Sequence, residues 1–301
     1  MKGFIKTHPY VLIFLLWNSL CLGFSATYFY ELYLHNEYYE EPPGFPSKLL
    51  AAPIIASFTG KGEGWTEKRF SAGLIEAIRL THNHTWIELI AAFGKERVRF
   101  NHQGVLGEKS RMGWDDFLID FGYNFLDESG KKQLLMHWLI GVPVRKKVTS
   151  AEIEGPLWGT RSYATGPVIE AAYDLIRSKE EDLFIGLLGR FLHRYKRHYE
   201  PILPLGAFFR PGDALDILAI THYRYYGQNI EVGYVYTRYY AIANEVAGII
   251  ERLPSERYNS FYIDYSYYYE EKALSFEINI TKTFGKPYDG ITVYWLIGWY
   301  F

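Results

Sequence analysis

The sequence predicts an all-β protein that folds as an antiparallel up-and-down transmembrane β-barrel of about 12 strands. Three observations lead to this prediction. Most of the chain after residue 49 consists of segments in which apolar and polar residues alternate with a period of two. The links between these segments alternate between long and short, as they do in membrane barrels. The last segment continues to the C-terminal residue, Phe301.

The composition of the 301 residues excludes several other classes. Apolar residues make up 49% and charged residues 22%, so the chain can form a core and is not intrinsically disordered. A net charge of −2 lacks the basic balance that nucleic-acid binding requires, so no nucleic-acid partner is expected. The mean hydropathy of −0.13 argues against a helical membrane protein, but alternating strands also average near zero. Cys21 is the only cysteine, which excludes a disulfide framework and a cysteine-based zinc site.

Residues 1–25 have the three parts of a secretory signal peptide. Lys2 and Lys6 form a basic start, an apolar stretch follows, and the small residues Gly23 and Ser25 precede a predicted cleavage site. The alternative, a retained membrane anchor, is disfavoured because the apolar stretch is too short to span a bilayer. A lipid anchor is disfavoured because Leu20, directly before Cys21, is not small.

Residues 26–48 form an irregular N-terminal segment that precedes the barrel domain, 49–301. Pro42, Pro43 and Pro46 interrupt any regular element there. The segment is compatible with a periplasmic tail and with a plug inside the barrel, and the sequence does not choose between them.

The barrel domain is predicted to contain strands at 50–59, 68–80, 85–98, 114–126, 132–145, 161–177, 182–197, 212–225, 229–244, 257–269, 272–284 and 290–301. Short links carry hairpin residues, as in Gly227-Gln228-Asn229. Short turns of membrane barrels lie on the periplasmic side and long loops lie outside. We therefore expect both ends of the mature chain in the periplasm and four loops at the cell surface, at 99–113, 146–160, 198–211 and 245–256.

The strands place apolar side chains on one face and polar side chains on the other. In the fourth strand, the apolar face is Phe117, Ile119, Phe121, Tyr123 and Phe125, and the opposite face is Asp116, Asp120, Gly122 and Asn124. In the second strand, Glu76 and Arg79 fall on opposite faces, so we expect a β-bulge or an error in the assigned register there.

Alternation alone does not separate a membrane barrel from a soluble lipocalin-like barrel, in which the apolar face points inward. Two features favour the membrane barrel. The large apolar residues of twelve such strands would overfill a soluble core. Tyrosine and tryptophan also gather near the strand ends, where membrane barrels carry interfacial girdles, at Trp114, Tyr223, Tyr225, Tyr226, Tyr239, Tyr240, Tyr258 and Tyr267 to Tyr269.

The final strand has apolar or aromatic residues at every second position, Val293, Trp295, Ile297, Trp299 and Phe301. Here the sequence resembles the single-chain outer-membrane β-barrels of Gram-negative bacteria, porins and channels among them. The resemblance covers about 49–301. It implies that the alternating residues of the final strand, Val293 to Phe301, form the signal read by the barrel assembly machinery. It also implies a location in the bacterial outer membrane, with outer-membrane lipids and lipopolysaccharide as partners.

The polar face of the strands gives candidate residues for the barrel interior. Bases concentrate on two neighbouring strands, with acids on both sides. Counting from the short turns places Glu170 opposite Arg190 and Arg224 near Glu231. A ladder of ion pairs that fills the interior is one reading, and a water-filled path for small polar solutes is the one we favour. The predicted lumen-lining residues are Asp116, Asp120, His137, Glu170, Asp174, Arg190, Arg194, Lys196, Asp216, His222, Arg224, Glu231, Asp264 and Glu277.

No catalytic, metal or cofactor site is predicted. A serine hydrolase in a barrel wall needs serine and histidine two residues apart on one strand face, and no His-x-Ser occurs. His82 and His84 fall in a predicted turn, where solvated side chains are more common than metal ligands.

The function that the sequence favours is a narrow channel for small hydrophilic or ionic solutes. A closed barrel that acts in adhesion, surface recognition or structure through its long loops is the alternative, and an outer-membrane lipid hydrolase is the third.

Replacing Phe301 by serine, or deleting it, is expected to leave the exported chain unassembled, because the terminal aromatic completes the assembly signal. Protease sensitivity in membrane fractions measures this. A heat-modifiable band of normal mobility on gels would show that Phe301 is dispensable.

Overall fold

The structure is a computed structural model. Residues 1–46, Asp116, Lys196 and Phe301, about which the sequence makes predictions, lie outside the residues it describes. The residues that the structure describes are 47–62, 65–82, 84–102, 104–114, 117–126, 132–144, 163–178, 180–195, 197–198, 207–210, 212–240, 243–246, 249–252, 255–269, 273–286 and 288–300.

The main sheet is antiparallel throughout and closes into a barrel of 12 strands, which confirms the predicted fold class. Each predicted strand overlaps one barrel strand. Their bounds are β1 (Lys48–Gly62), β2 (Trp65–His82), β3 (Thr85–His102), β5 (Phe117–Leu126), β6 (Lys132–Val142), β7 (Ala164–Arg177), β8 (Glu181–Arg194), β11 (Ala214–Tyr225), β12 (Gln228–Tyr239), β15 (Glu256–Tyr269), β16 (Leu274–Lys286) and β17 (Tyr288–Tyr300).

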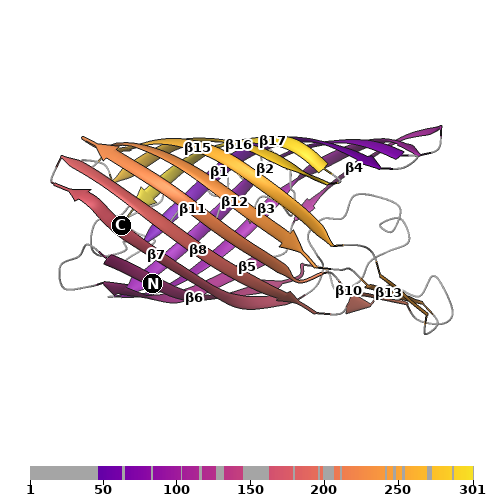
Figure 1. Cartoon of the computed structure of the whole chain (residues 1–301), viewed down its shortest axis with the longest axis horizontal. Coiled ribbons are helices and arrows are strands. Elements are labelled where there is room, and N and C mark those ends of the chain that lie inside the picture. Colours follow the sequence, from indigo (N-terminus) through magenta and orange to yellow (C-terminus); the bar gives the residue numbers. More distant parts are fainter. Residues whose placement is uncertain are drawn as a thin grey trace, which may run out of the picture.

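The first and last strands close the barrel. β1 pairs with β17 from Lys48–Tyr300 to Gly60–Tyr288, and on its other side with β2. Both ends of the described barrel therefore lie near the rim that carries the short turns, whereas the longer connections lie at the opposite rim (Figure 1).

The segment 99–113 is a strand hairpin, which corrects the prediction of a loop. β3 continues to His102, and β4 (Val105–Trp114) returns along it from Val105–His102 to Trp114–Phe93. β5 then continues along the first half of β3, with the register shifted by one residue between Trp114–Phe93 and Leu118–Ile90. Such a shift is typical of a β-bulge. The sequence hides this hairpin because charged residues occupy both of its faces.

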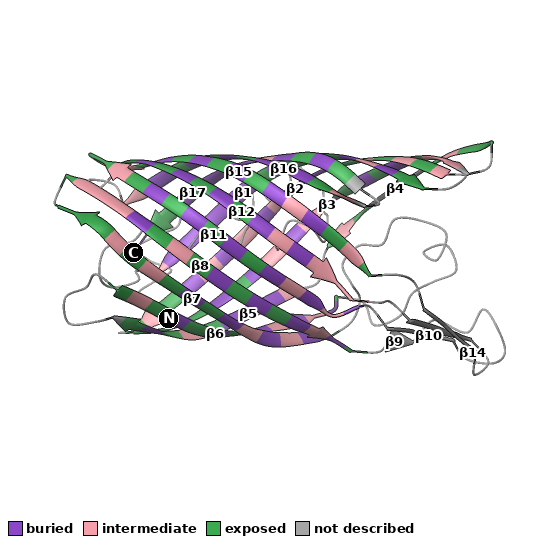
Figure 2. Ribbon diagram, in the orientation of Figure 1, coloured by how far each residue is buried: buried purple, intermediate pink, exposed green. Residues whose placement is uncertain are grey.

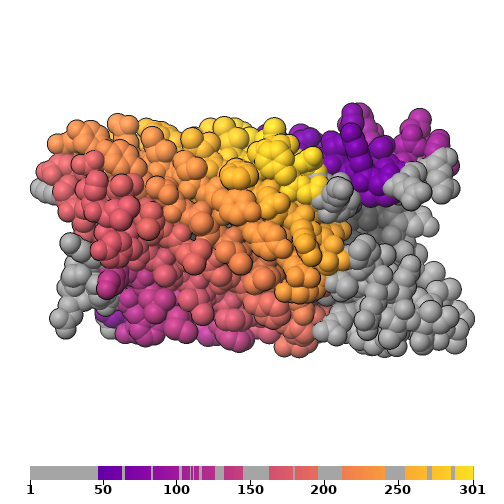
Figure 3. All heavy atoms as spheres, viewed as in Figure 1, coloured from indigo at the N-terminus to yellow at the C-terminus, as the bar shows by residue number. Residues whose placement is uncertain are grey.

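β1 to β4 extend together beyond the rim as a projecting sheet, formed by 57–62, 65–71, 95–102 and 105–113 (Figures 1 and 3). Two of the other expected surface loops contribute to a second, smaller sheet. Its strands are β9 (Arg197–His198), β10 (Ala207–Arg210), β13 (Ala243–Val246) and β14 (Ile249–Arg252).

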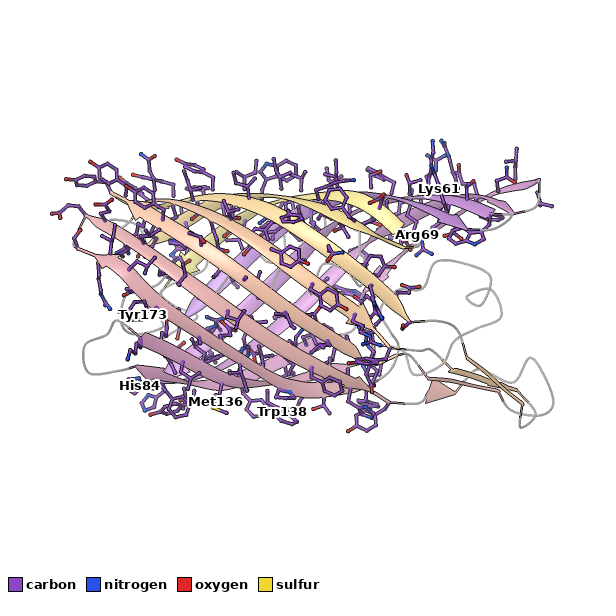
Figure 4. The ribbon with its side chains drawn as sticks, in the orientation of Figure 1. Lys61, Arg69, His84, Met136, Trp138 and Tyr173 are labelled. Atoms are coloured by element: carbon purple, nitrogen blue, oxygen red, sulfur yellow. The ribbon has the colours of Figure 1, made fainter. Side chains whose placement is uncertain are left out.

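Burial alternates along each barrel strand, as Figure 2 shows in purple and green. Large apolar side chains on the outer face are exposed, as expected of a lipid-facing surface. Met136, Trp138 and Tyr173 point outward in this way (Figure 4). Tyr239 and Tyr258 differ from the predicted girdle, because they occupy inner positions and Tyr258 is 1% exposed.

β2 contains no bulge, contrary to the prediction from Glu76 and Arg79. It pairs in unbroken register with β1 and β3. Glu76 faces outward, and Arg79 faces inward against Glu88, so the two charges belong to different environments rather than to a register error. Among the described residues, no helix is long and apolar enough to cross a membrane.

The position of the hairpins gives a labelling test of topology. Cysteine at Leu106, which is 79% exposed on β4, should react with an impermeant thiol reagent on intact cells, whereas cysteine at Gln228, in the turn region at the opposite rim, should not. Leu106 is preferable to Gly107, where a Cβ atom would lie 2.2 Å from the Phe100 ring. Labelling at Gln228 but not at Leu106 would show that the barrel has the opposite orientation in the membrane.

Candidate functional site: the barrel interior

The predicted lumen-lining residues that the structure describes all occupy inner positions of their strands. Most are buried, and Asp120, Glu170 and Asp216 are 0% exposed. Asp174 and Arg224, near the short-turn rim, are partly exposed. Because the charged groups at mid-barrel are shielded from water, each requires a compensating partner.

The interior has two chemically different walls. On the barrel strands from β1 to β8 and on β11, the inner positions at mid-barrel are mainly apolar, including Ile90, Leu135, Leu139 and Leu218. On β12, β15, β16 and β17, they are mainly hydroxyl, amide and carboxylate residues, which we call the polar wall. Its members are Asn229, Glu231, Thr237, Ser260, Asp264, Ser266, Ser275, Glu277, Asn279, Thr281, Thr283 and Thr292.

His137 joins two carboxylates across three strands. Its Nδ1 lies 2.8 Å from Asp120 Oδ1 and its Nε2 lies 2.8 Å from Glu170 Oε1. The Trp86 indole N–H donates to the other Asp120 oxygen at 3.2 Å. An imidazolium ring can donate to both carboxylates, whereas a neutral ring has only one N–H. The Asp120–His137–Glu170 group is therefore a buried hydrogen-bonded triad that links β5, β6 and β7.

Arg79 and Glu88, which the sequence analysis did not select for the interior, form a second buried pair next to this triad. Arg79 Nη2 lies 2.8 Å from Glu88 Oε2, and both side chains are 0% exposed. The guanidinium also lies 5.9 Å from the centroid of the Trp86 ring. The two residues are directly opposite on β2 and β3. A correct register for this hairpin would have identified them.

Arg190 pairs with Asp216 and not with Glu170, which corrects the predicted pair. Its Nε and Nη2 donate to Asp216 Oδ2 at 2.9 and 2.7 Å, and Thr237 Oγ1 donates to Oδ1 at 2.7 Å. The prediction failed because the β7–β8 register shifts between Asp174 and Ile176, which places Leu188 opposite Glu170.

Arg224 pairs with Asp182 and not with Glu231, the second correction. The hairpin turn is Tyr226-Gly227, both with positive φ (47° and 77°), as a type I′ turn requires. This turn sets His222 opposite Glu231. Because the sequence analysis placed the turn later, at Gly227 to Asn229, it shifted the expected partner.

Glu231 Oε1 accepts a hydrogen bond from the Tyr262 hydroxyl at 2.5 Å, and Glu231 Oε2 lies 3.3 Å from His222 Nδ1. The Phe184 ring stacks on the His222 ring, with the two ring centroids 4.5 Å apart. Glu277 similarly accepts from the Tyr294 hydroxyl at 2.7 Å. Two carboxylates of the polar wall are therefore held by phenol groups.

Arg194 is held at the long-loop side of the interior. Its Nη1 donates to the Gly212 carbonyl at 3.2 Å, and its guanidinium carbon lies 5.2 Å from the centroid of the Tyr239 ring. Arg190 and Arg194 are therefore more enclosed than a water-filled lumen would make them.

The His137 triad does not have the arrangement of a serine hydrolase centre. Both ring nitrogens of His137 are occupied by carboxylates, so neither is available to activate a serine hydroxyl. Within the described part of the chain, no group of three His, Cys, Asp or Glu residues is arranged to hold a metal ion.

Comparison with known proteins identifies the fold class. No protein-family model and no curated protein sequence matches the chain. An outer membrane channel from Pseudomonas putida F1 superposes with a TM-score of 0.66 at 13% identity, covering 87% of this chain and 98% of that one. The transport unit of the autotransporter AIDA-I from Escherichia coli superposes with a TM-score of 0.55 at 9% identity, covering 91% and 98%. The chain thus has the fold of bacterial outer-membrane β-barrels.

Replacing His137 by alanine should destabilise the barrel by about 3–5 kcal/mol, because it leaves Asp120 and Glu170 buried without their shared partner. Equilibrium unfolding of the refolded protein in urea measures this. His193→Ala is the matched control: His193 lies 3.0 Å from Asp213 but is 36% exposed, so about 1 kcal/mol or less is expected. Equal losses in the two variants would contradict a special role for the triad.

Proposed function

We propose that this protein is an outer-membrane channel for small polar solutes, which pass along the polar wall with a preference for cations. The proposal includes export by the N-terminal signal and insertion in the bacterial outer membrane.

The distribution of charge over the interior carries this proposal. Glu231, Asp264 and Glu277 lie on the polar wall, and none of the described inner positions of β12, β15, β16 and β17 is lysine or arginine. Across the barrel, three arginines of β2, β8 and β11 face acids of their own, as in Arg79–Glu88, Arg190–Asp216 and Arg224–Asp182.

This distribution favours cations over anions. Rings or rows of carboxylates select cations in narrow pores, because the field in a confined low-dielectric space is poorly screened. Arginines already paired with carboxylates contribute little net field to a passing ion. Because Arg190 and Arg224 are paired with Asp216 and Asp182, they give no basis for anion selectivity.

The serine, threonine and asparagine side chains supply the second line of support. On β16, every inner position from Ser275 to Thr283 is polar, which provides exchangeable hydrogen bonds along the strand. Such a row can replace part of the hydration shell of a solute step by step. The fold similarity to an outer membrane channel is consistent with this function.

A closed barrel that acts through its surface elements is the second candidate. It is favoured by the burial of the inner side chains at mid-barrel and by the projecting sheet. In a channel, the polar wall must become hydrated when a solute passes. In a closed barrel, it stays packed.

Single-channel recording in planar bilayers separates these functions. We expect small cation-selective conductance from the purified protein. Asp264→Asn combined with Glu277→Gln should move the reversal potential toward that of anions, because two wall carboxylates are removed. Glu76→Gln, a neutralisation of the same kind on the lipid-facing side, should leave it unchanged.

Absence of conductance in protein that shows normal heat-modifiable mobility would exclude the channel and favour the closed barrel. Conductance with unaltered selectivity in the double variant would place the path elsewhere in the interior.

A further inference from the structure

The outer face of the projecting sheet carries a basic patch that the proposed channel does not use. Five cations share this face, on the three neighbouring strands β1, β2 and β3, and all are exposed. They are Lys61, Lys68, Lys95, Arg97 and Arg99. Lys61 points away from the sheet on this face, and Arg69 comes from the opposite face (Figure 4).

The cations of the basic patch are close neighbours. Lys68 and Arg99 are directly opposite in the β2–β3 register, and Arg97 follows Arg99 on the same face. Directly opposed like charges destabilise an antiparallel pair. Charge repulsion of this kind is relieved when an anion binds between the two side chains.

Few acids oppose this charge. Glu108 on β4 accepts hydrogen bonds from Arg97 and Arg99, at 2.7 Å from the Nε atom of each. These bonds hold the pKa of Glu108 below its ordinary value, so it remains an anion. Asp289 on β17 is exposed next to Thr59. Lys61, Lys68 and Lys95 form no ion pair with any residue that the structure describes.

The basic patch begins where the lipid-facing surface ends. Lys95 follows Phe93, which packs against Trp114 with ring centroids 5.0 Å apart, and Lys68 precedes the exposed Phe70. Positions two apart on one strand face are separated by about 7 Å. Aromatic rings mark the level of the membrane interface, so the cations lie at headgroup height, directed toward the lipid and not toward the pore.

We infer that this basic patch binds the phosphate groups of lipopolysaccharide in the outer leaflet next to the barrel. The inference rests on the outer-membrane orientation proposed above, but not on conduction. Several fixed cations at the correct height match the phosphates of a glycolipid whose acyl chains lie against the apolar outer face. Arg97 and Arg99, held by Glu108, form the ordered part, and the lysines supply mobile charge.

The test uses purified, refolded protein in dodecyl maltoside, titrated with bisphosphorylated lipid A in the presence of a chelator and followed by native mass spectrometry. The variant Lys68→Gln/Lys95→Gln removes two cations and preserves the Arg97–Glu108–Arg99 contacts. At about 1 kcal/mol for each cation near an anionic surface, affinity should fall about thirtyfold. Raising the salt concentration should weaken binding to the wild type more than to the variant.

The control is Lys132→Gln, which removes an outward-facing cation at the opposite rim. It should bind lipid A as the wild type does. Equal affinity of the wild type and the Lys68→Gln/Lys95→Gln variant would overturn the inference. Equal binding of dephosphorylated lipid A would overturn it by assigning binding to the acyl chains. Full competition by inorganic phosphate at the same concentration would overturn it in favour of a free-phosphate site.

The same preparations are recorded in bilayers made without lipopolysaccharide. Silence in those recordings, with lipid binding intact, would refute the channel and leave the basic patch standing. Conduction without a difference in lipid A binding between the wild type and the Lys68→Gln/Lys95→Gln variant would support the channel and refute the lipid-binding patch.

Discussion

The closure of the sheet is the constraint on which the rest of the structure depends. A backbone N–H or C=O group that faces hydrocarbon has no water to bind, so each strand in the membrane needs a paired neighbour on both sides. The pairing of β1 with β17 meets this need for the two strands that would otherwise be edges. Once the sheet is closed, one face of every strand must contact lipid and the other must face a confined interior, which explains why burial alternates so regularly.

The confined interior then determines what its residues can be. Apolar side chains on one wall pack against each other, and the polar wall satisfies its hydroxyl and carboxylate groups through neighbours such as Tyr262 and Tyr294. Charges on the apolar side are matched closely, as in Arg79–Glu88 and the His137 triad. This division separates a part of the interior that stabilises the barrel from a part that can interact with a solute.

The strands, their faces and the choice of interior residues could be predicted from the sequence because alternation is a local signal. The partners of those residues could not be predicted, because an error of one residue in the position of a turn shifts every cross-strand pair of the hairpin. Arg224 was assigned to Glu231 for this reason, since Tyr226 is an unusual residue for a position with positive φ. The β3–β4 hairpin was missed because both of its faces lie outside the hydrocarbon layer, where no apolar periodicity is required. Arg79 was missed as an interior residue because its partner, Glu88, was not recognised as its direct neighbour.

The cross-strand position of the ion pairs has a consequence for how the chain enters the bilayer. Arg79 and Glu88 face each other within one hairpin. Such a hairpin brings both charges into the membrane already beside each other, so the cost of dehydrating a lone ion is reduced. Arg190 and Asp216 belong to different hairpins, β7–β8 and β11–β12. These two hairpins have to meet before either is fully dehydrated, so the register of the finished barrel favours insertion of β7 to β12 as one unit.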